Sequence, residues 1–153
     1  MRSTPIVSLL QVAYAAELET VQNYLANSVW LEGLGTREVV DALADNVAEK
    51  LGYAGRLAQR LKQLGACPPG SLVVARNQVL LQPAEDPTDL RHVVGGALAA
   101  TRQLIATYGA LAAAAVGTDP VTAALAVQLL AAEEKHRCLF EGFLKSLDRP
   151  PAV

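Results

Sequence analysis

Apolar residues recur every three or four positions in four long stretches of the sequence, which is the spacing expected of helices with one buried face. Turn and cap residues separate these stretches. Gly33, Gly65 and Gly117 are typical helix stops, and Asp119 followed by Pro120 is typical of a helix start. The sequence therefore predicts helices from Thr4 to Glu32, from Thr36 to Leu64, from just beyond Pro87 to Val116, and from Pro120 to Leu147.

The lengths of the connections predict how these helices are arranged. The first two helices and the last two are each joined by a few residues, so each pair is expected to form an antiparallel hairpin. The segment from Ala66 to Glu85 can travel the length of a bundle, and Ser71 to Val74 within it is expected to be extended. We therefore predict an all-α protein with a single domain over residues 1–153, in which one long crossover makes the second and third helices parallel.

Each predicted helix carries a polar side chain near the middle of its apolar seam. These residues are Glu17, Lys50, Thr101, Glu133 and His136. Mid-helix positions lie at the same height in a bundle, whichever way each helix runs, so we expect the side chains to converge in one layer. Taken singly, a glutamate is more often solvated and a histidine more often an ordinary core residue. An unpaired buried charge costs on the order of several kcal/mol, so converging groups must neutralise one another or bind an ion.

Composition excludes several classes of function. The formal net charge is −2 and no run of Lys or Arg occurs, so binding to nucleic acid through its phosphates is not expected. No apolar stretch is long and uninterrupted enough to cross a membrane. Cys67 and Cys138 fit neither a disulfide framework nor a zinc motif, so we expect reduced thiols in a cytoplasmic protein. Hydrophobic residues make up 52% of the chain, a surplus that would suit a partner subunit.

Two motifs resemble those of the ferritin-like superfamily, and of bacterioferritin and its small relatives in particular. The stretch Glu17-Leu-Glu-Thr-Val-Gln-Asn-Tyr24 resembles the first-helix signature, a terminal carboxylate ligand with a tyrosine two turns later. Glu133-Glu-Lys-His136 resembles the fourth-helix Glu-x-x-His, which supplies a bridging carboxylate and an imidazole. The resemblance covers essentially the whole chain and implies a ferritin-like antiparallel four-helix bundle with a di-iron site.

Three positions depart from the pattern of that superfamily. Lys50 stands at the second bridging carboxylate and Tyr53 at the second histidine, while starting this motif at Glu49 leaves Gly52, which cannot bind a metal. Thr101 stands where the third helix should carry a glutamate, by its spacing from a tyrosine. Three of six implied ligands remain, namely Glu17, Glu133 and His136. We expect the Lys50 ammonium to pair with the two remaining glutamates, with Tyr53 and Thr101 completing the hydrogen bonds.

These substitutions leave three alternatives open. In the first, the protein has no cofactor, does not bind a normal dinuclear centre, and holds its core together with Glu, Lys, His and Tyr side chains. In the second, it is an enzyme, ferroxidase-like or oxygen-activating, that binds one or two iron ions with the remaining ligands and recruited acids such as Glu19, Glu49 or Glu134. In the third, oxygen chemistry has modified Lys50 or a nearby tyrosine, and the candidates are Tyr24, Tyr53 and Tyr108.

The same resemblance bears on haem and on assembly. In bacterioferritin a methionine beside the second-helix glutamate binds haem, whereas Leu51 stands there and the only methionine is Met1, so no haem is expected. The sequence ends soon after the fourth helix, without the short fifth helix of the large cages. We therefore expect a homo-oligomer, a dimer or larger, that is not a 24-subunit cage. Trp30 and residues 110–115 are candidates for its interface.

Overall fold

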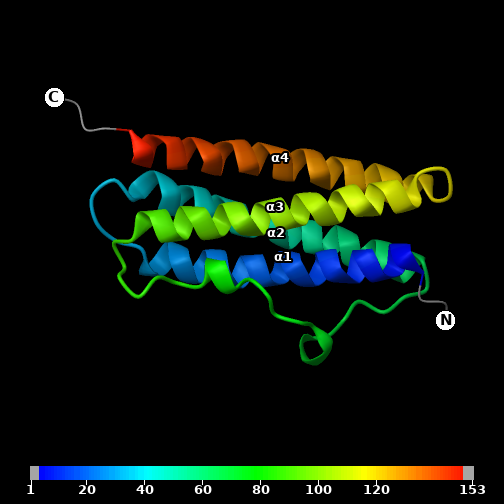
Figure 1. The fold of residues 1–153 in the computed structure, drawn as a ribbon. Coiled ribbons are helices and arrows are strands. Elements are labelled where there is room, and N and C mark those ends of the chain that lie inside the picture. Colours follow the sequence, from blue (N-terminus) through cyan, green and yellow to red (C-terminus); the bar gives the residue numbers. More distant parts are fainter. Residues whose placement is uncertain (1–3, 150–153) are drawn as a thin grey trace.

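Four long helices form the body of the molecule in the computed structural model, which describes residues 4–149 (Figure 1). The helices are α1 (Pro5–Trp30), α2 (Arg37–Gln63), α3 (Leu90–Ala115) and α4 (Pro120–Asp148), and two short 3-10 turns, η1 (Ser71–Val73) and η2 (Val79–Leu81), lie in the crossover. No strand occurs within residues 4–149, and the predicted all-α class and helix boundaries are confirmed to within a few residues. Met1 lies outside the described residues. The predicted extended stretch at Ser71 is wrong, because η1 forms there.

Local capping explains where the helices start. The Thr4 hydroxyl accepts a hydrogen bond from the Val7 N–H at 3.1 Å at the start of α1. The Asp119 carboxylate accepts from the Thr122 N–H at 3.0 Å at the start of α4. Thr36 precedes α2 without such a bond, because its hydroxyl donates to the Gly33 carbonyl at 2.7 Å. The Thr36 side chain therefore makes a turn contact rather than a helix cap.

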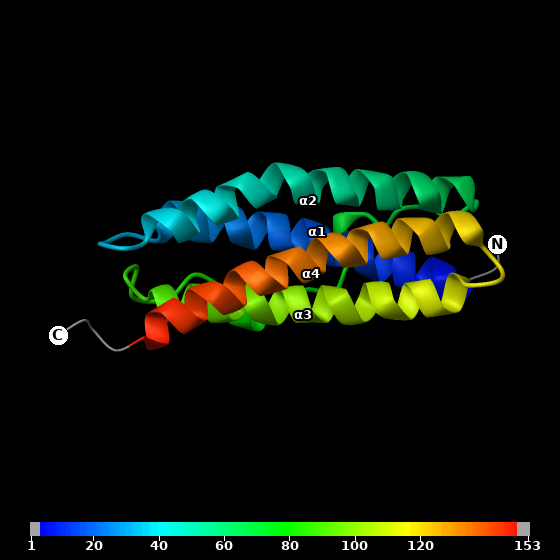
Figure 2. The same ribbon diagram turned by 90° about the horizontal axis from the view of Figure 1, so that it is seen from above.

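The helices are connected as two antiparallel hairpins, α1 with α2 and α3 with α4, and the long crossover runs back along the bundle between them (Figures 1 and 2). As a result α2 and α3 run parallel, as predicted. The α1 and α3 pair is in close contact, whereas the α2 and α4 pair is in much looser contact. Long polar side chains can therefore meet between α2 and α4. No helix in the described range is long and apolar enough to cross a membrane.

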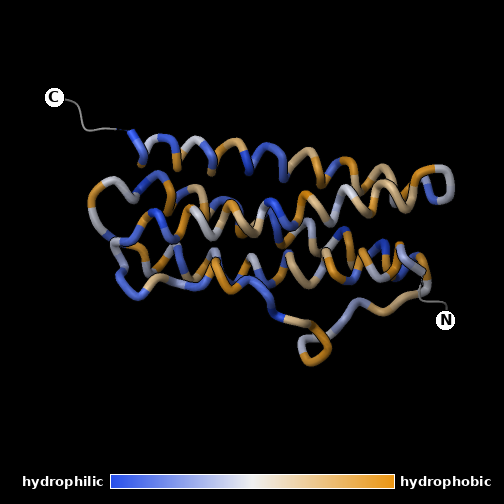
Figure 3. Tube along the Cα trace, viewed as in Figure 1, coloured by the Kyte–Doolittle hydropathy of each residue, from blue (hydrophilic) through white to orange (hydrophobic). Residues whose placement is uncertain are grey.

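Two apolar clusters make up the core, one toward each end of the bundle. The first includes Leu10, Leu57, Leu104 and Leu129, and the second includes Leu43, Val94, Leu98 and Phe140. Hydrophobic and hydrophilic residues alternate along each helix (Figure 3), which places the apolar seams inward. The positions between the two clusters along every helix are the polar ones that interrupt the seams, so a polar layer divides the core.

A group of neutral side chains, which we call the amide cluster, fastens the crossover to α1. It consists of Thr20, Asn23, Asn27 and Gln78. The Gln78 side-chain amide donates to the Thr20 hydroxyl at 2.6 Å and accepts from Asn23 at 3.1 Å. The Asn27 amide donates to the Leu81 carbonyl at 2.8 Å. These bonds hold the second half of the crossover in place.

Close backbone packing holds the same part of the crossover against α3. A Cβ atom added at Gly96 would lie 2.1 Å from the Leu80 carbonyl oxygen, so only glycine permits this approach. Trp30 is 49% exposed, and its indole N–H donates to the Ala84 carbonyl at 2.8 Å. Trp30 therefore helps to seat the crossover, while its predicted role in a subunit interface stays a prediction.

Candidate functional site

Lys50 lies at the centre of the polar layer. Its Nζ is 2.7 Å from Oε1 of Glu133 and 3.3 Å from Oε1 of Glu17. All three side chains are 0% exposed, and they come from α2, α4 and α1. The predicted convergence of these residues is confirmed. We call Glu17, Lys50, Glu133 and the adjacent His136 the ion-pair layer.

The Lys50 ammonium also faces an aromatic ring. Its Nζ lies 5.7 Å from the centroid of the Tyr24 ring, within the range of a cation–π interaction. Burial raises the pKa of Tyr24 to about 12, and burial also raises the pKa of Tyr108. Both tyrosines are therefore neutral phenols at neutral pH, and they leave the ammonium to be balanced by carboxylates.

One ammonium faces two carboxyl groups in a buried layer, and the pKa values of the two carboxyl groups shift in opposite directions. Burial raises the pKa of Glu17 to about 8, against the opposing charge of Lys50. Burial also acts to raise the pKa of Glu133, but hydrogen bonds from His136 and Lys50 hold it below its usual value. At neutral pH Glu17 is therefore largely protonated while Glu133 carries the negative charge. Oε2 of Glu17 has no hydrogen-bond partner among the described residues.

The Lys50 ammonium keeps its positive charge. Burial acts to lower the pKa of Lys50, but the charges of Glu17 and Glu133 raise it above its usual value. Because Glu17 is largely protonated, the Lys50 ammonium and the ionised Glu133 carboxylate neutralise one another. A layer of this composition satisfies the electrostatic requirement of burial without any bound ion.

His136 links the buried layer to the surface. Its Nδ1 lies 3.3 Å from Oε2 of Glu133, and its Nε2 lies 3.6 Å from Oε2 of Glu49, whose side chain is 46% exposed. The Tyr53 hydroxyl donates to Glu49 on the preceding turn of α2. This contact was missed from the sequence, although the i, i+4 spacing of Glu49 and Tyr53 could have predicted it. The imidazole is thus flanked by a buried carboxylate on one side and a solvent-accessible one on the other.

Two predicted members of the Lys50 network have other partners. The Thr101 hydroxyl is buried but donates to the Ala97 carbonyl, one turn earlier in α3, at 2.8 Å. The Tyr53 hydroxyl turns to Glu49 instead of Lys50. The expectation that both would complete the hydrogen bonds of Lys50 is corrected accordingly. A threonine is short enough to bond back to its own helix, and the tyrosine is long enough to reach the rim.

The other recruited acids named from the sequence lie outside the ion-pair layer. Glu19 accepts hydrogen bonds from two backbone N–H groups of the crossover, and Glu134 pairs with Arg137. Within residues 4–149, no group of three or more His, Cys, Asp or Glu side chains is arranged to hold a metal ion. Cys67 and Cys138 are free and exposed. The roles of Glu17, Glu133 and His136 as metal ligands stay predictions.

Solved structures with the same fold were found in several bacteria. The dodecameric thioferritin of Bacteroides fragilis, described as bacterioferritin-related, superposes with a TM-score of 0.83 at 20% identity, over 93% of this chain and 85% of that one. Bacterioferritin BfrA of Mycobacterium tuberculosis gives 0.80 at 19% identity, over 97% and 89%. Dps of Staphylococcus aureus gives 0.82 at 16% identity, over 91% and 94%. These similarities establish the shared bundle.

The sequence itself identifies the family. No match was found among curated proteins. Residues 7–149, nearly the whole chain, match the family described as the ferritin-like domain. That match agrees with the two hairpins, the long crossover and the superposed structures. The chain therefore belongs to the ferritin-like domain family.

Proposed function

We propose that this protein is a ferritin-like bundle in which the ion-pair layer takes the place of a dinuclear metal centre, and that it acts as a structural or binding protein. The observation that supports this proposal is the position of the Lys50 ammonium, which contacts Glu133 at 2.7 Å and Glu17 at 3.3 Å. A positive side chain thus fills the position that the metal ions of relatives are expected to occupy.

The donor set argues in the same direction. A dinuclear carboxylate centre uses about four carboxylates and two imidazoles, which offset the charge of two divalent ions. Here Lys50, Tyr53 and Thr101 replace three donors, and the raised pKa of Glu17 leaves that carboxyl group largely protonated. A divalent ion about 4 Å from the Lys50 ammonium would be repelled by roughly 8 kcal/mol, taking about 4 kcal/mol per pair of unit charges. The residues present therefore do not fit a dinuclear centre.

Metal loading of the wild type and of a variant with restored donors tests this proposal. The variant Lys50→Glu/Tyr53→His/Thr101→Glu supplies the three missing donors, and the matched control Tyr53→His/Thr101→Glu keeps the ammonium. Each protein is loaded anaerobically with ferrous iron, and the bound ions per chain are counted after desalting. We expect two ions per chain in the triple variant alone. Two ions per chain in the wild type would refute the proposal.

A single-ion site at the rim is the alternative, and the position of His136 favours it. Its two ring nitrogens face Glu133 and the exposed Glu49 at 3.3 and 3.6 Å, so a rearrangement could gather these groups around one iron ion. The protein would then act as a ferroxidase-like or oxygen-activating enzyme. Ferrous-dependent oxygen uptake should then be lost in His136→Ala and kept in His92→Ala, which removes the other histidine. Equal uptake in both variants would refute this alternative.

We also propose that the protein forms a homo-oligomer in the cytoplasm. The Bacteroides fragilis relative is described as dodecameric, and α1 of this chain exposes Leu25, Val29 and Trp30 on its surface. Light scattering during gel filtration measures the subunit number, and a monomer at high protein concentration would contradict the proposal. A covalent modification of Lys50 or a tyrosine stays a prediction, which the mass of the intact protein tests.

A further inference from the structure

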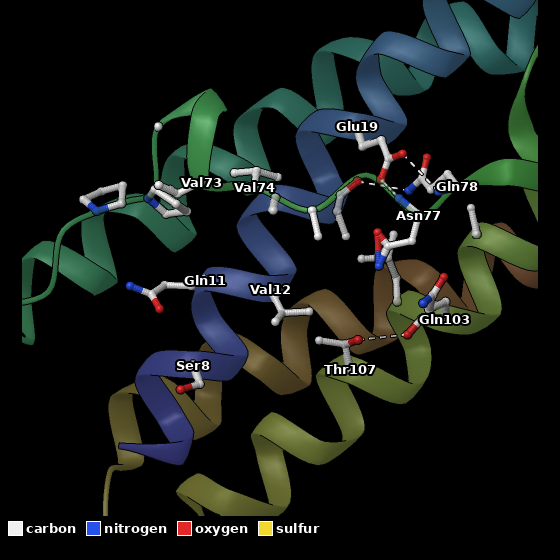
Figure 4. Close-up of a pocket in the computed structure, with 18 of the residues that line it drawn as sticks. Ser8, Gln11, Val12, Glu19, Val73, Val74, Asn77, Gln78, Gln103 and Thr107 are labelled. Atoms are coloured by element: carbon white, nitrogen blue, oxygen red, sulfur yellow. Dashed lines mark hydrogen bonds between the residues drawn. The ribbon is translucent and has the colours of Figure 1, made fainter. Parts of the chain in front are cut away.

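A deep groove lies on the side of α1 that faces the crossover. It has a volume of about 610 Å³ and is bounded by one face of α1, one face of α3 and the first half of the crossover (Figure 4). Ligand sites in proteins typically have volumes of roughly 300–1,000 Å³, so the groove is large enough for a small organic molecule. Glu17, Lys50 and Glu133 do not line it. The groove is therefore separate from the ion-pair layer, and its role is independent of the proposed function.

The groove is elongated because its floor follows α1. The α1 residues that line it lie on one face, from Ser8 through Val12 and Ala15 to Glu19. Glu19 lies eleven positions after Ser8, which corresponds to about 16 Å of helix. Alanine at the central positions leaves the floor open. The shape favours a long, narrow ligand over a compact one.

The lining is apolar with a few polar groups. Its apolar residues include Val12, Val73, Val74, Ala100 and Leu104. The polar side chains at its margins include Gln11, Asn77, Gln103 and Thr107. Among residues 4–149, Glu19 is the only charged residue in the lining. Arg76 lines a neighbouring pocket and donates to the side-chain oxygen of Gln22 at 2.8 Å. A ligand must therefore be largely apolar, and an anionic ligand would meet a carboxylate without a compensating cation.

Glu19 is held in place at one end of the groove. Its carboxylate accepts hydrogen bonds from the backbone N–H groups of Asn77 at 3.2 Å and Gln78 at 3.0 Å. Figure 4 shows Glu19 beside these two residues, with Ser8 at the opposite end of the α1 face. Two hydrogen bonds leave further lone pairs of the carboxylate available. The groove thus combines an apolar channel with a fixed negative charge at one end.

We propose that the groove binds a long-chain organic amine, with the ammonium group at Glu19 and the hydrocarbon chain along α1 toward Ser8. Burial of the hydrocarbon drives binding, and the ion pair with Glu19 selects the amine over an alcohol or a carboxylate. No covalent step is involved. The site would allow the protein to bind or carry such amines.

The two free cysteines provide a test with an internal control. Cys67 lines the groove, whereas Cys138 is exposed on α4 and does not. Decylamine, decanol and decanoate, each below its micelle concentration, are added before alkylation by N-ethylmaleimide, and mass spectrometry follows each cysteine. We expect decylamine to slow alkylation of Cys67 and leave Cys138 unchanged. Its apparent affinity should exceed that of decanol by about fivefold, the contribution of one partly screened ion pair, and decanoate should protect least.

Two pairs of variants locate the ligand. Glu19→Gln should remove the preference for decylamine over decanol and keep protection by decanol, whereas the control Glu38→Gln, at an exposed position of α2, should change neither. Val12→Trp should fill the groove and abolish protection by every probe. Val127→Trp, at an exposed position of α4 outside the groove, should leave protection intact.

Several results would overturn the proposal. Protection of both cysteines to the same extent would show non-specific binding, and equal protection by decanoate and decylamine would exclude a role for Glu19. Failure of every probe to protect Cys67 would exclude the site. If Cys67 of the ligand-free protein became unreactive as protein concentration rose, a second copy of the chain would cover the groove and the proposal would be wrong. None of these results depends on metal loading.

Discussion

The ion-pair layer and the amide cluster are two buried polar groups that share α1, and they differ in the partners they use. The amide cluster is neutral, and its donors bond to amide, hydroxyl and backbone oxygens. The ion-pair layer places one ammonium between two carboxyl groups. Both the layer and the cluster leave one oxygen without a partner in the described chain, Oε2 of Glu17 and Oδ1 of Asn27. Removing a member of the neutral group exposes hydrogen-bonding atoms, whereas removing Lys50 strands a charge.

This difference indicates different roles for the two groups. The amide cluster has an evident structural role, since it holds the crossover against α1. Well-packed hydrophobic residues are often as stabilising as a buried ion pair, so stability alone does not explain the ion-pair layer. Under the proposed function, the charged layer is a set of side chains that neutralise one another where a dinuclear centre is expected in relatives.

The largest expected effect comes from Lys50→Met, which keeps the length of the side chain and removes its charge. The variant should lose about 3–5 kcal/mol of unfolding free energy, because the buried Glu133 carboxylate loses its ammonium partner. Denaturant unfolding of wild type and variant measures the loss. An unchanged free energy of unfolding would show that Lys50 does not neutralise the layer.

Double variants sharpen this result by identifying which glutamate carries the charge. Because the pKa of Glu133 is lowered and that of Glu17 is raised, Lys50→Met/Glu133→Gln should regain most of the lost free energy. The matched variant Lys50→Met/Glu17→Gln should regain less. The opposite order would mean that Glu17 is the ionised partner.

A pH titration of stability should give the next largest effect. The folded protein holds the proton of Glu17 more tightly than the unfolded chain does, since its pKa rises from 4.5 to about 8. This contribution to stability is fully present below pH 4.5 and is lost as the pH rises through 8. The slope should be absent in Glu17→Gln and kept in Glu38→Gln. An identical slope in Glu17→Gln would contradict the protonated state.

Breaking the amide cluster should have a smaller effect. Gln78→Leu removes the bonds to Thr20 and Asn23 but strands no charge, so we expect a loss of about 1–2 kcal/mol. The crossover should also become more susceptible to limited proteolysis. Gln59→Leu, at an exposed position of α2, is the control. A loss as large as that of Lys50→Met would remove the distinction between the two groups.

Thr101→Val should have the smallest effect. The Thr101 hydroxyl bonds to the Ala97 carbonyl of its own helix, so its loss should cost at most about 1 kcal/mol. Thermal unfolding compared with wild type measures this cost. A loss of several kcal/mol would show that Thr101 belongs to the ion-pair layer after all.

Much of the fold and the centre of the site could be predicted from the sequence. Helical spacing, glycine stops and the Asp119 cap predicted where the helices lie. The polar residues that interrupt the apolar seams predicted that Glu17, Lys50 and Glu133 would meet. These features depend on local periodicity and on the common height of mid-helix positions. Such information is present in a single sequence.

Other features, namely the partners of single hydroxyl groups and the path of the crossover, could not be predicted from residue spacing. The hydroxyls of Thr101 and Tyr53 donate to nearer partners than the Lys50 network, because each has a hydrogen-bond acceptor within its own helix. The crossover formed the turn η1 rather than an extended segment. The groove depends on the path of the first half of the crossover, where Cys67, Val73 and Val74 line it.

A crystal structure of the protein soaked anaerobically in ferrous iron, with anomalous data at the iron edge, tests the central claim most directly. We expect Lys50 Nζ within hydrogen-bonding distance of Glu17 and Glu133, with no anomalous peak between the two carboxyl groups. A pair of iron peaks between them, or a Lys50 side chain turned to solvent, would contradict the claim.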